Sequence, residues 1–209
     1  MRRLPVYLLL DCSGSMMGEP IEAVKNGVQV MVNSLRNDPQ ASELASIGVI
    51  TFDSSARQLI PLTKIDDFQM KDIQASGTTS LGEALKVLSI SIDIEITKTT
   101  PETKGDWKPL VFIMTDGMPT DDWKSGLAEF QKRKTGIVVG CAAGNNADTQ
   151  VLKQITENVV SISIDDITKF FQWVTASIGV SSTKVEDSGK EVGGLNELPP
   201  PPSELNIVV

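Results

Sequence analysis

The sequence contains no histidine, only two cysteines and no long apolar run among its 209 residues. Without histidine, Ser-His-Asp and Cys-His catalysis are excluded, and so is zinc bound by imidazole. Cys12 and Cys141 are too few for a disulfide framework or a four-cysteine zinc site. We therefore expect two small buried thiols in a reducing compartment. No apolar stretch reaches the length of a transmembrane helix, so we expect no membrane span.

Basic side chains are also scarce. The chain has 19 Lys and Arg against 27 Asp and Glu, which gives a formal net charge of -8. It has no basic run and no basic-aromatic patch, so nucleic acid is not an expected partner. The start of the chain resembles a signal peptide faintly, but its apolar run contains Pro5 and ends at Asp11 without a small-residue cleavage site. We expect a cytoplasmic protein.

The sequence does contain an alternation of strand and helix patterns. Short apolar runs predict strands at about 6–10, 47–52, 57–62, 110–114, 136–141 and 159–164. Apolar residues spaced by three and four predict helices at about 20–35, 81–94, 122–132, 148–158 and 166–181. Pro61 cannot donate a ladder hydrogen bond, which places strand 57–62 at an edge. We predict an α/β fold: a doubly wound, mostly parallel sheet with one antiparallel edge strand and helices on both faces.

The composition changes after Ser182, where glycine, proline and charged residues become frequent. We predict one domain over residues 1–182 and a flexible tail over residues 183–209 that is dispensable for folding. The apolar, β-prone residues 205–209 leave two alternatives. They form either a frayed end or a short strand that docks on a sheet edge, its own or a partner's.

Hydroxyl and carboxylate side chains lie on three predicted loops. Asp11, Ser13 and Ser15 follow the first strand, Thr79 precedes a helix, and Asp116 follows strand 110–114. Open α/β sheets bind ligands at the carboxyl ends of their strands. Hard oxygens without nitrogen or sulfur suit Mg²⁺ or Mn²⁺. Asp-x-Ser-x-Ser by itself is more often a turn than a metal site, so the prediction depends on all three loops together.

These residues resemble the metal-ion-dependent adhesion site of von Willebrand factor A (VWA) domains. That pattern is Asp-x-Ser-x-Ser, a Thr after a Gly-containing loop, and an Asp after the fourth strand. The family's Gly-Gly-Thr loop reads Gly77-Thr78-Thr79 here, and we align Thr79 with its threonine. The resemblance covers about residues 1–182 and implies a VWA, Rossmann-like fold. It implies direct ligation by Ser13 and Ser15, and direct or water-mediated ligation by Asp11, Thr79 and Asp116.

The charge of this set implies a binding function. Two carboxylates only neutralise a divalent cation, and hydroxyls add no charge. The cation stays electrophilic and keeps an exchangeable water, which an Asp or Glu of a protein partner can replace. We therefore predict a metal-dependent protein-binding module, not an enzyme.

A second resemblance concerns residues 2–11, 18–22 and 115–121, which are similar to bacterial tellurium-resistance TerY proteins. This resemblance implies a cytoplasmic scaffold in tellurite resistance and associated stress signalling. It also implies a PP2C-type phosphatase and a protein kinase of the same system as partners.

Two alternative functions stay open. Leu10-Asp11-x-Ser13 partly imitates the haloacid-dehalogenase phosphatases, which would make Asp11 a nucleophile. Ser13 cannot serve as their general acid-base at neutral pH, and no Gly-x-x-x-x-Gly-Lys-Ser/Thr loop is present, so we expect no catalytic residue. The hydroxyls of residues 78–80 are alternatively phosphorylation targets of the associated kinase, and added phosphate would compete with partner carboxylates.

Three further acids have structural explanations. One of Asp121 and Asp122 is expected to cap the following helix, with binding of a metal-bound water as the alternative. Asp53 is expected to be a hairpin turn residue, with a place at the rim of the site as the alternative.

Overall fold

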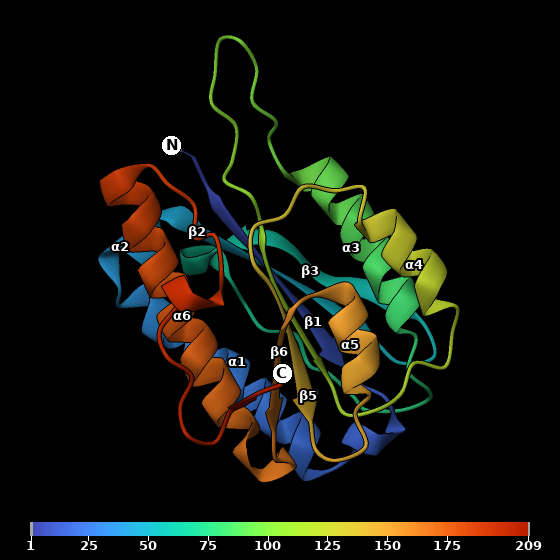
Figure 1. The fold of residues 1–209 in the computed structure, drawn as a ribbon. Coiled ribbons are helices and arrows are strands. Elements are labelled where there is room, and N and C mark those ends of the chain that lie inside the picture. The colour runs from blue at the N-terminus through green and yellow to red at the C-terminus, as the bar shows by residue number, and fades with distance from the viewer. Residues whose placement is uncertain (1, 209) are drawn as a thin grey trace.

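The computed structural model describes residues 2–208, which form a seven-stranded sheet with helices on both faces (Figure 1). The strands are β1 (Leu4–Asp11), β2 (Ala45–Phe52), β3 (Ala56–Lys64), β4 (Leu110–Thr115), β5 (Val138–Ala143), β6 (Asn158–Ile162) and β7 (Asn206–Ile207). The α-helices are α1 (Glu19–Arg36), α2 (Pro39–Leu44), α3 (Leu81–Glu95), α4 (Trp123–Phe130), α5 (Thr149–Ile155) and α6 (Ile167–Ser188). Short 3-10 helices lie at Gly14–Met16, Ile65–Asp67, Ile164–Asp166 and Leu195–Glu197.

The strand order is β3-β2-β1-β4-β5-β6-β7. Strands β1, β2, β4, β5 and β6 are parallel, and β3 pairs antiparallel with β2 at one edge. This confirms the predicted doubly wound, mostly parallel sheet and the edge position of the strand that contains Pro61. Because parallel strands end at the same edge of the sheet, the loops after β1 and β4 are brought together.

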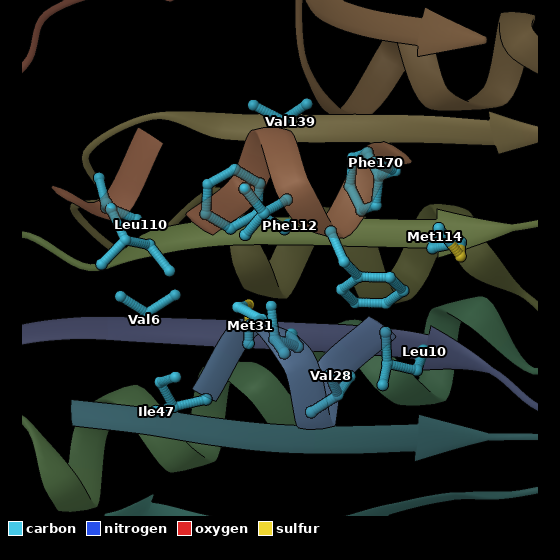
Figure 2. Close-up of a cluster of buried hydrophobic side chains, with 14 of the residues drawn as sticks. Val6, Leu10, Val28, Met31, Ile47, Leu110, Phe112, Met114, Val139 and Phe170 are labelled. Carbon is cyan, nitrogen blue, oxygen red and sulfur yellow. The ribbon is translucent and has the colours of Figure 1, made fainter. Parts of the chain in front are cut away.

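Strand β1 lies in the middle of the sheet, and all eight of its residues are buried. Alternate side chains enter opposite cores, as the two-residue period of a strand requires. Val6 and Leu10 enter the same core as Phe170 of α6, under α1 and α6 (Figure 2). Tyr7 and Leu9 belong to the other core, under α3, α4 and α5. A strand buried on both faces explains the continuous apolar run in the sequence.

Helix α2 was not predicted. Asp38 caps it, accepting hydrogen bonds from the backbone N–H groups of Gln40 and Ala41 at 3.0 and 3.1 Å. The helix has only six residues, which is too short for a periodic apolar pattern to be recognised.

The C-terminal segment differs from the predicted tail. Helix α6 continues to Ser188, so the predicted boundary at 182 falls inside it. Beyond the helix, Val192, Leu198 and Leu205 are buried in the core under α1 and α6. Strand β7 pairs antiparallel with β6, so the segment docks on a sheet edge of its own chain. Val209 lies outside the described residues.

A few apolar residues spaced among glycine and proline account for this difference, since average composition does not reveal them.

Among residues 2–208, no helix is both long and apolar enough to cross a membrane.

Candidate metal-binding site

The first loop of the site begins where β1 ends. The carboxylate of Asp11 is fully buried, and each of its oxygens accepts a hydrogen bond. The backbone N–H of Ser13 donates to Oδ1 at 2.8 Å, and the hydroxyl of Thr115 donates to Oδ2 at 2.6 Å. Thr115 is the last residue of β4, so Asp11 holds the ends of two neighbouring strands in register.

Asp116 brings the second loop to the first. The hydroxyl of Ser15 donates to Oδ1 of Asp116 at 2.7 Å, and Oγ of Ser15 lies 3.1 Å from Oγ of Ser13. Asp116 and Ser13 are buried, whereas Ser15 is exposed. A chain of three oxygens from two loops therefore joins two buried side chains, Ser13 and Asp116, through the exposed hydroxyl of Ser15.

The third loop places Thr79 beside Asp116. A Cβ atom added to Gly117 would lie 3.4 Å from Oγ1 of Thr79, so the hydroxyl faces the residue next to Asp116. Thr79 is buried, and it exchanges two hydrogen bonds with Thr120: its N–H donates to the Thr120 hydroxyl at 3.0 Å, and its carbonyl accepts from the Thr120 N–H at 2.9 Å. Thr78 instead is exposed and hydrogen-bonds to Ser54. The structure therefore places Thr79, and not Thr78, at the site.

Backbone contacts fix the first and third loops to each other. The N–H of Gly14 donates to the carbonyl of Gly77 at 3.0 Å, and the N–H of Ser76 donates to the carbonyl of Cys12 at 2.9 Å. Gly77 has a φ of +70°, and a Cβ atom there would lie 2.2 Å from Oγ of Ser54. This position therefore requires glycine for both conformation and space.

The acids that the sequence left ambiguous have capping roles. Asp122 caps α4 by accepting from the N–H of Ser125 at 3.2 Å. Asp121 caps α3, accepting from the N–H groups of Gly82 and Glu83 at 3.0 and 2.8 Å. Asp121 thus fixes the helix that follows Thr79. Asp53 accepts from the N–H of Ser55 at 3.0 Å, as expected for a turn residue.

The donor set fits a small hard cation. Adjacent ligands of an octahedral Mg²⁺ ion, bound at about 2.1 Å, lie about 3 Å apart. The two spacings within the Ser13–Ser15–Asp116 chain, 3.1 and 2.7 Å, bracket that value. Within residues 2–208, no group of three or more His, Cys, Asp or Glu side chains is placed to hold a metal. Any cation at this site therefore depends on the hydroxyls.

The electrostatics of the site follow from burial. Burial raises the pKa of Asp11 above its usual value, although the hydrogen bonds from Thr115 and Ser13 oppose the shift. Burial also raises the pKa of the Cys12 thiol to about 11, so this side chain is a neutral thiol at physiological pH. Cys12 and Cys141 are both free and buried, as predicted.

Two features of the site were not predicted from the sequence. The first is Thr115, whose role as a partner of Asp11 requires knowing that β1 and β4 are neighbours. The second is a pair of exposed apolar side chains, Met17 and Met118, which are 64% and 63% exposed. Each lies two positions after a member of the Ser15–Asp116 hydrogen bond. A methionine two residues after Ser15 and another two residues after Asp116 are a sequence signal that could have indicated an apolar rim around the site.

Comparison with known proteins adds a family match. The family model of the von Willebrand factor type A domain matches residues 6–172. An uncharacterized protein of Synechocystis is 32% identical over 123 residues, which cover 56% of this chain and 26% of that protein. A von Willebrand factor A domain-containing protein of Dictyostelium discoideum is 27% identical over 157 residues, covering 69% of this chain and 15% of that protein. The chain thus spans about a quarter or less of the length of these relatives.

Solved structures match the fold. Proximal thread matrix protein 1 from the mussel byssus, in a structure with a zinc-occupied MIDAS motif, has a TM-score of 0.64 and 19% identity. The match covers 84% of this chain and 48% of the mussel chain. The von Willebrand factor type A structure from Catenulispora acidiphila has a TM-score of 0.63 and 16% identity, covering 86% of this chain and 43% of that chain.

Proposed function

Because the chain belongs to the von Willebrand factor type A domain family, we propose that it is a metal-dependent protein-binding module whose cation recruits an acidic residue of a partner. The observation that carries this proposal is the convergence of Asp11, Ser13, Ser15, Thr79 and Asp116 from three loops. These residues would hold Mg²⁺ or Mn²⁺, which supplies a Lewis-acidic centre open to one more oxygen ligand.

The charge of the site supports recruitment of an acid. Its two carboxylates balance the charge of one divalent cation, and the three hydroxyls are neutral. None of the five side chains forms an ion pair with Lys or Arg among residues 2–208. A partner carboxylate is the oxygen ligand that gains most from such a cation, because it adds a full charge to the bond.

The exposed rim supports a protein partner. Met17 and Met118, which follow Ser15 and Asp116 by two residues, present flexible, polarizable side chains to solvent. Methionine adapts to irregular apolar surfaces and is frequent at protein-binding faces. A partner segment that pairs an acidic residue with neighbouring apolar side chains matches both parts of this surface.

We also propose a cellular setting. The resemblance of residues 2–11, 18–22 and 115–121 to TerY proteins supports a cytoplasmic scaffold in tellurite resistance and stress signalling. The proposed partners are the PP2C-type phosphatase and the protein kinase of the same system. Of the three loop hydroxyls considered as phosphorylation targets, Thr78 is exposed, whereas Thr79 and Ser80 are buried.

The test combines cation titration with partner capture. Mg²⁺ and Mn²⁺ are titrated calorimetrically into the wild type and into Asp116→Ala, and both proteins are used for pull-downs with the purified phosphatase and kinase. We expect a cation-dependent complex with the wild type that EDTA dissociates and that Asp116→Ala fails to form. A complex that persists unchanged in EDTA would show that the contact does not pass through a cation. Phosphatase assay of the wild type and Asp11→Asn serves as the enzymatic control, and we expect no turnover from either.

A further inference from the structure

Basic side chains gather at the end of the sheet opposite the metal-binding site. We call this end the amino pole; it comprises residues 2–3, 64, 97–109 and 132–134. In Figure 1 the loop between α3 and β4 projects at this end, beside the N-terminus. Two cavities of 460 and 450 Å³ lie here and share Thr97 and Asp106 in their linings. Four cations line the first cavity and five line the second, so the amino pole holds nine of the 19 Lys and Arg of the chain.

This concentration runs against the charge of the whole protein. Only three acids, Glu43, Asp93 and Asp106, line the two cavities, whereas the chain as a whole has a formal net charge of -8. In the second cavity Lys108, Lys132 and Arg133 pair with Glu191, Glu129 and Asp93, so the excess of positive charge lies in the first cavity, where four cations face two acids. Such a charge asymmetry steers a small anion toward the first cavity.

The arginines of the first cavity are partly committed to the fold. Arg3 pairs with Asp106 at 2.7 Å and donates to the carbonyl of Glu95 at 2.6 Å. The guanidinium of Arg2 stacks on the ring of Trp107, with its carbon 3.4 Å from the ring centroid, and its Nε donates to the carbonyl of Gly105. Arg3 is thus a structural group, whereas the two terminal nitrogens of Arg2 have no acceptor among residues 2–208.

Two lysines of the same cavity, Lys64 and Lys104, make no polar contact with other side chains or backbone groups among residues 2–208. Lys64 ends strand β3, and Lys104 lies on the loop before β4. Both are exposed, and neither side chain forms a hydrogen bond or ion pair with any of residues 2–208. Three cationic groups from three separate segments, Arg2, Lys64 and Lys104, therefore line one concave space. The two lysines and the terminal nitrogens of Arg2 have no acceptor among residues 2–208.

We propose that this cavity binds a compact anion with several phosphate groups, of the polyphosphate type. Its volume of 460 Å³ lies in the range of small-ligand sites. Lysine ammonium groups act as mobile point charges toward phosphate oxygens, and closely spaced phosphates are needed to contact cations on three sides. Arg2 covers the ring of Trp107, which is only 9% exposed, so stacking of a nucleic-acid base has no platform here. A chain of phosphates fits this cavity better than a nucleic acid.

The experiment is calorimetric titration with tripolyphosphate in EDTA, which prevents any divalent cation from bridging phosphate to the metal-binding site. The test variant is Lys64→Gln with Lys104→Gln. The matched control is Lys71→Gln with Lys86→Gln, which removes the same charge from two exposed lysines outside both cavities. We expect the test variant to bind about tenfold more weakly than the wild type, with a shallower salt dependence. The control should bind within about twofold of the wild type.

Three outcomes would overturn the proposal. These are absence of tripolyphosphate binding to the wild type at low salt, equal losses in the test and control pairs, and tighter binding of a single-stranded oligonucleotide than of tripolyphosphate at the same lysines. Lys64→Arg with Lys104→Arg keeps the charge and is expected to keep binding. This second variant maintains the test if the glutamine pair fails to fold.

Discussion

The two ends of the central strands treat a buried carboxylate in opposite ways. At the amino pole, Asp106 accepts hydrogen bonds from the Arg3 guanidinium and from backbone N–H groups. We call the other end the carboxyl pole and define it by Asp11, Ser13, Ser15, Thr79 and Asp116. Among residues 2–208, its acids accept only from hydroxyl and N–H groups. One pole contains its own cation and the other does not.

The pKa shifts express this difference. Burial raises the pKa of Asp11, and its hydrogen bonds do not reverse the shift. Burial also acts to raise the pKa of Asp106, but the Arg3 hydrogen bond and backbone donors outweigh it, and the pKa lies below the usual value. A buried acid with an arginine partner has its negative charge balanced within the fold. A buried acid without such a partner depends on hydrogen bonds alone, and the cation that we propose for the carboxyl pole would stabilise its charged form.

The largest expected effect concerns the C-terminal segment, which contacts the amino pole and also packs on the core under α1 and α6 and on strand β6. Glu191 accepts from the backbone N–H of Lys108 and pairs with its Nζ at 2.8 Å. Removal of residues 189–209 also uncovers the core around Leu198 and Leu205. We expect a loss of about 3 kcal/mol in unfolding free energy, or roughly 10 °C in Tm. Calorimetric melting measures it, and unchanged cation affinity of the shortened protein would sharpen the contrast between the poles.

A melting temperature within a degree or two of the full chain would instead restore the sequence-based expectation of a dispensable tail. Replacement of Glu191 alone by Gln is the matched control, because it removes the ion pair and keeps the apolar contacts. We expect this control to cost less than about 1 kcal/mol.

Asp116→Ala tests the role of the unpaired carboxylates at the carboxyl pole. It removes one of two carboxylates and the acceptor of the Ser15 hydroxyl. We expect Mg²⁺ or Mn²⁺ affinity to fall about 100-fold or more, because half of the site's negative charge is lost. The far-ultraviolet circular dichroism spectrum should persist. Asp53→Asn, at a turn acid outside the site, should leave cation affinity unchanged; an equal loss there would indicate a general charge effect.

Asp106→Asn tests the role of the Arg3–Asp106 ion pair at the amino pole. The amide cannot pair with Arg3 and cannot accept all of the hydrogen bonds that the carboxylate accepts. We expect a loss of about 2 kcal/mol near neutral pH, measured by urea unfolding. Cation affinity at the carboxyl pole should not change.

The same variant has a defined pH dependence. The folded-state pKa of Asp106 is depressed, so its stabilisation is fully present above its unfolded pKa, about 3.9, and is lost as pH falls through the folded value. The stability difference between wild type and Asp106→Asn should therefore shrink as the pH falls below about 4. A difference that stays constant into strong acid would assign the effect to shape and not to charge.

The smallest expected effect concerns the apolar rim. Met17→Ala with Met118→Ala should weaken binding of the proposed partner about fivefold and leave Mg²⁺ affinity unchanged, because neither side chain offers an oxygen ligand. The pair Val30→Ala and Val180→Ala removes exposed apolar groups on α1 and α6 and serves as the control. Equal partner binding by both pairs would confine recognition to the cation.

Much of the fold could be predicted because its signals are local. The continuous apolar runs of β1 and β4 identify buried strands, and the three- and four-residue spacing of α1 identifies its buried face. The loops of the site could also be predicted from local signals, because each follows an apolar run or precedes a helix. Their meeting could be expected because parallel strands end at one edge of a sheet. That these five residues ligate a cation stays a prediction, as do the partners.

The features that could not be predicted depend on residues far apart in sequence. Thr115 reaches Asp11 only because β4 pairs with β1. Composition after Ser182 suggested disorder, but buried Leu198 and Leu205 have a core to enter only once α1 and α6 are packed.

The amino pole gives the clearest contrast. The sequence has no basic run. It also does not reveal the contact between Arg2 and Trp107, because these residues precede β1 and β4, which become neighbours only in the folded sheet. Strands β1 to β6, the longer helices and the loops that carry hard oxygens could be predicted from the sequence, because hydrophobic periodicity and turn chemistry act over a few residues. Only the tertiary structure decided which loops share a hydrogen bond, where the C-terminal segment docks and where the positive charge gathers, because those contacts depend on strand order and chain packing.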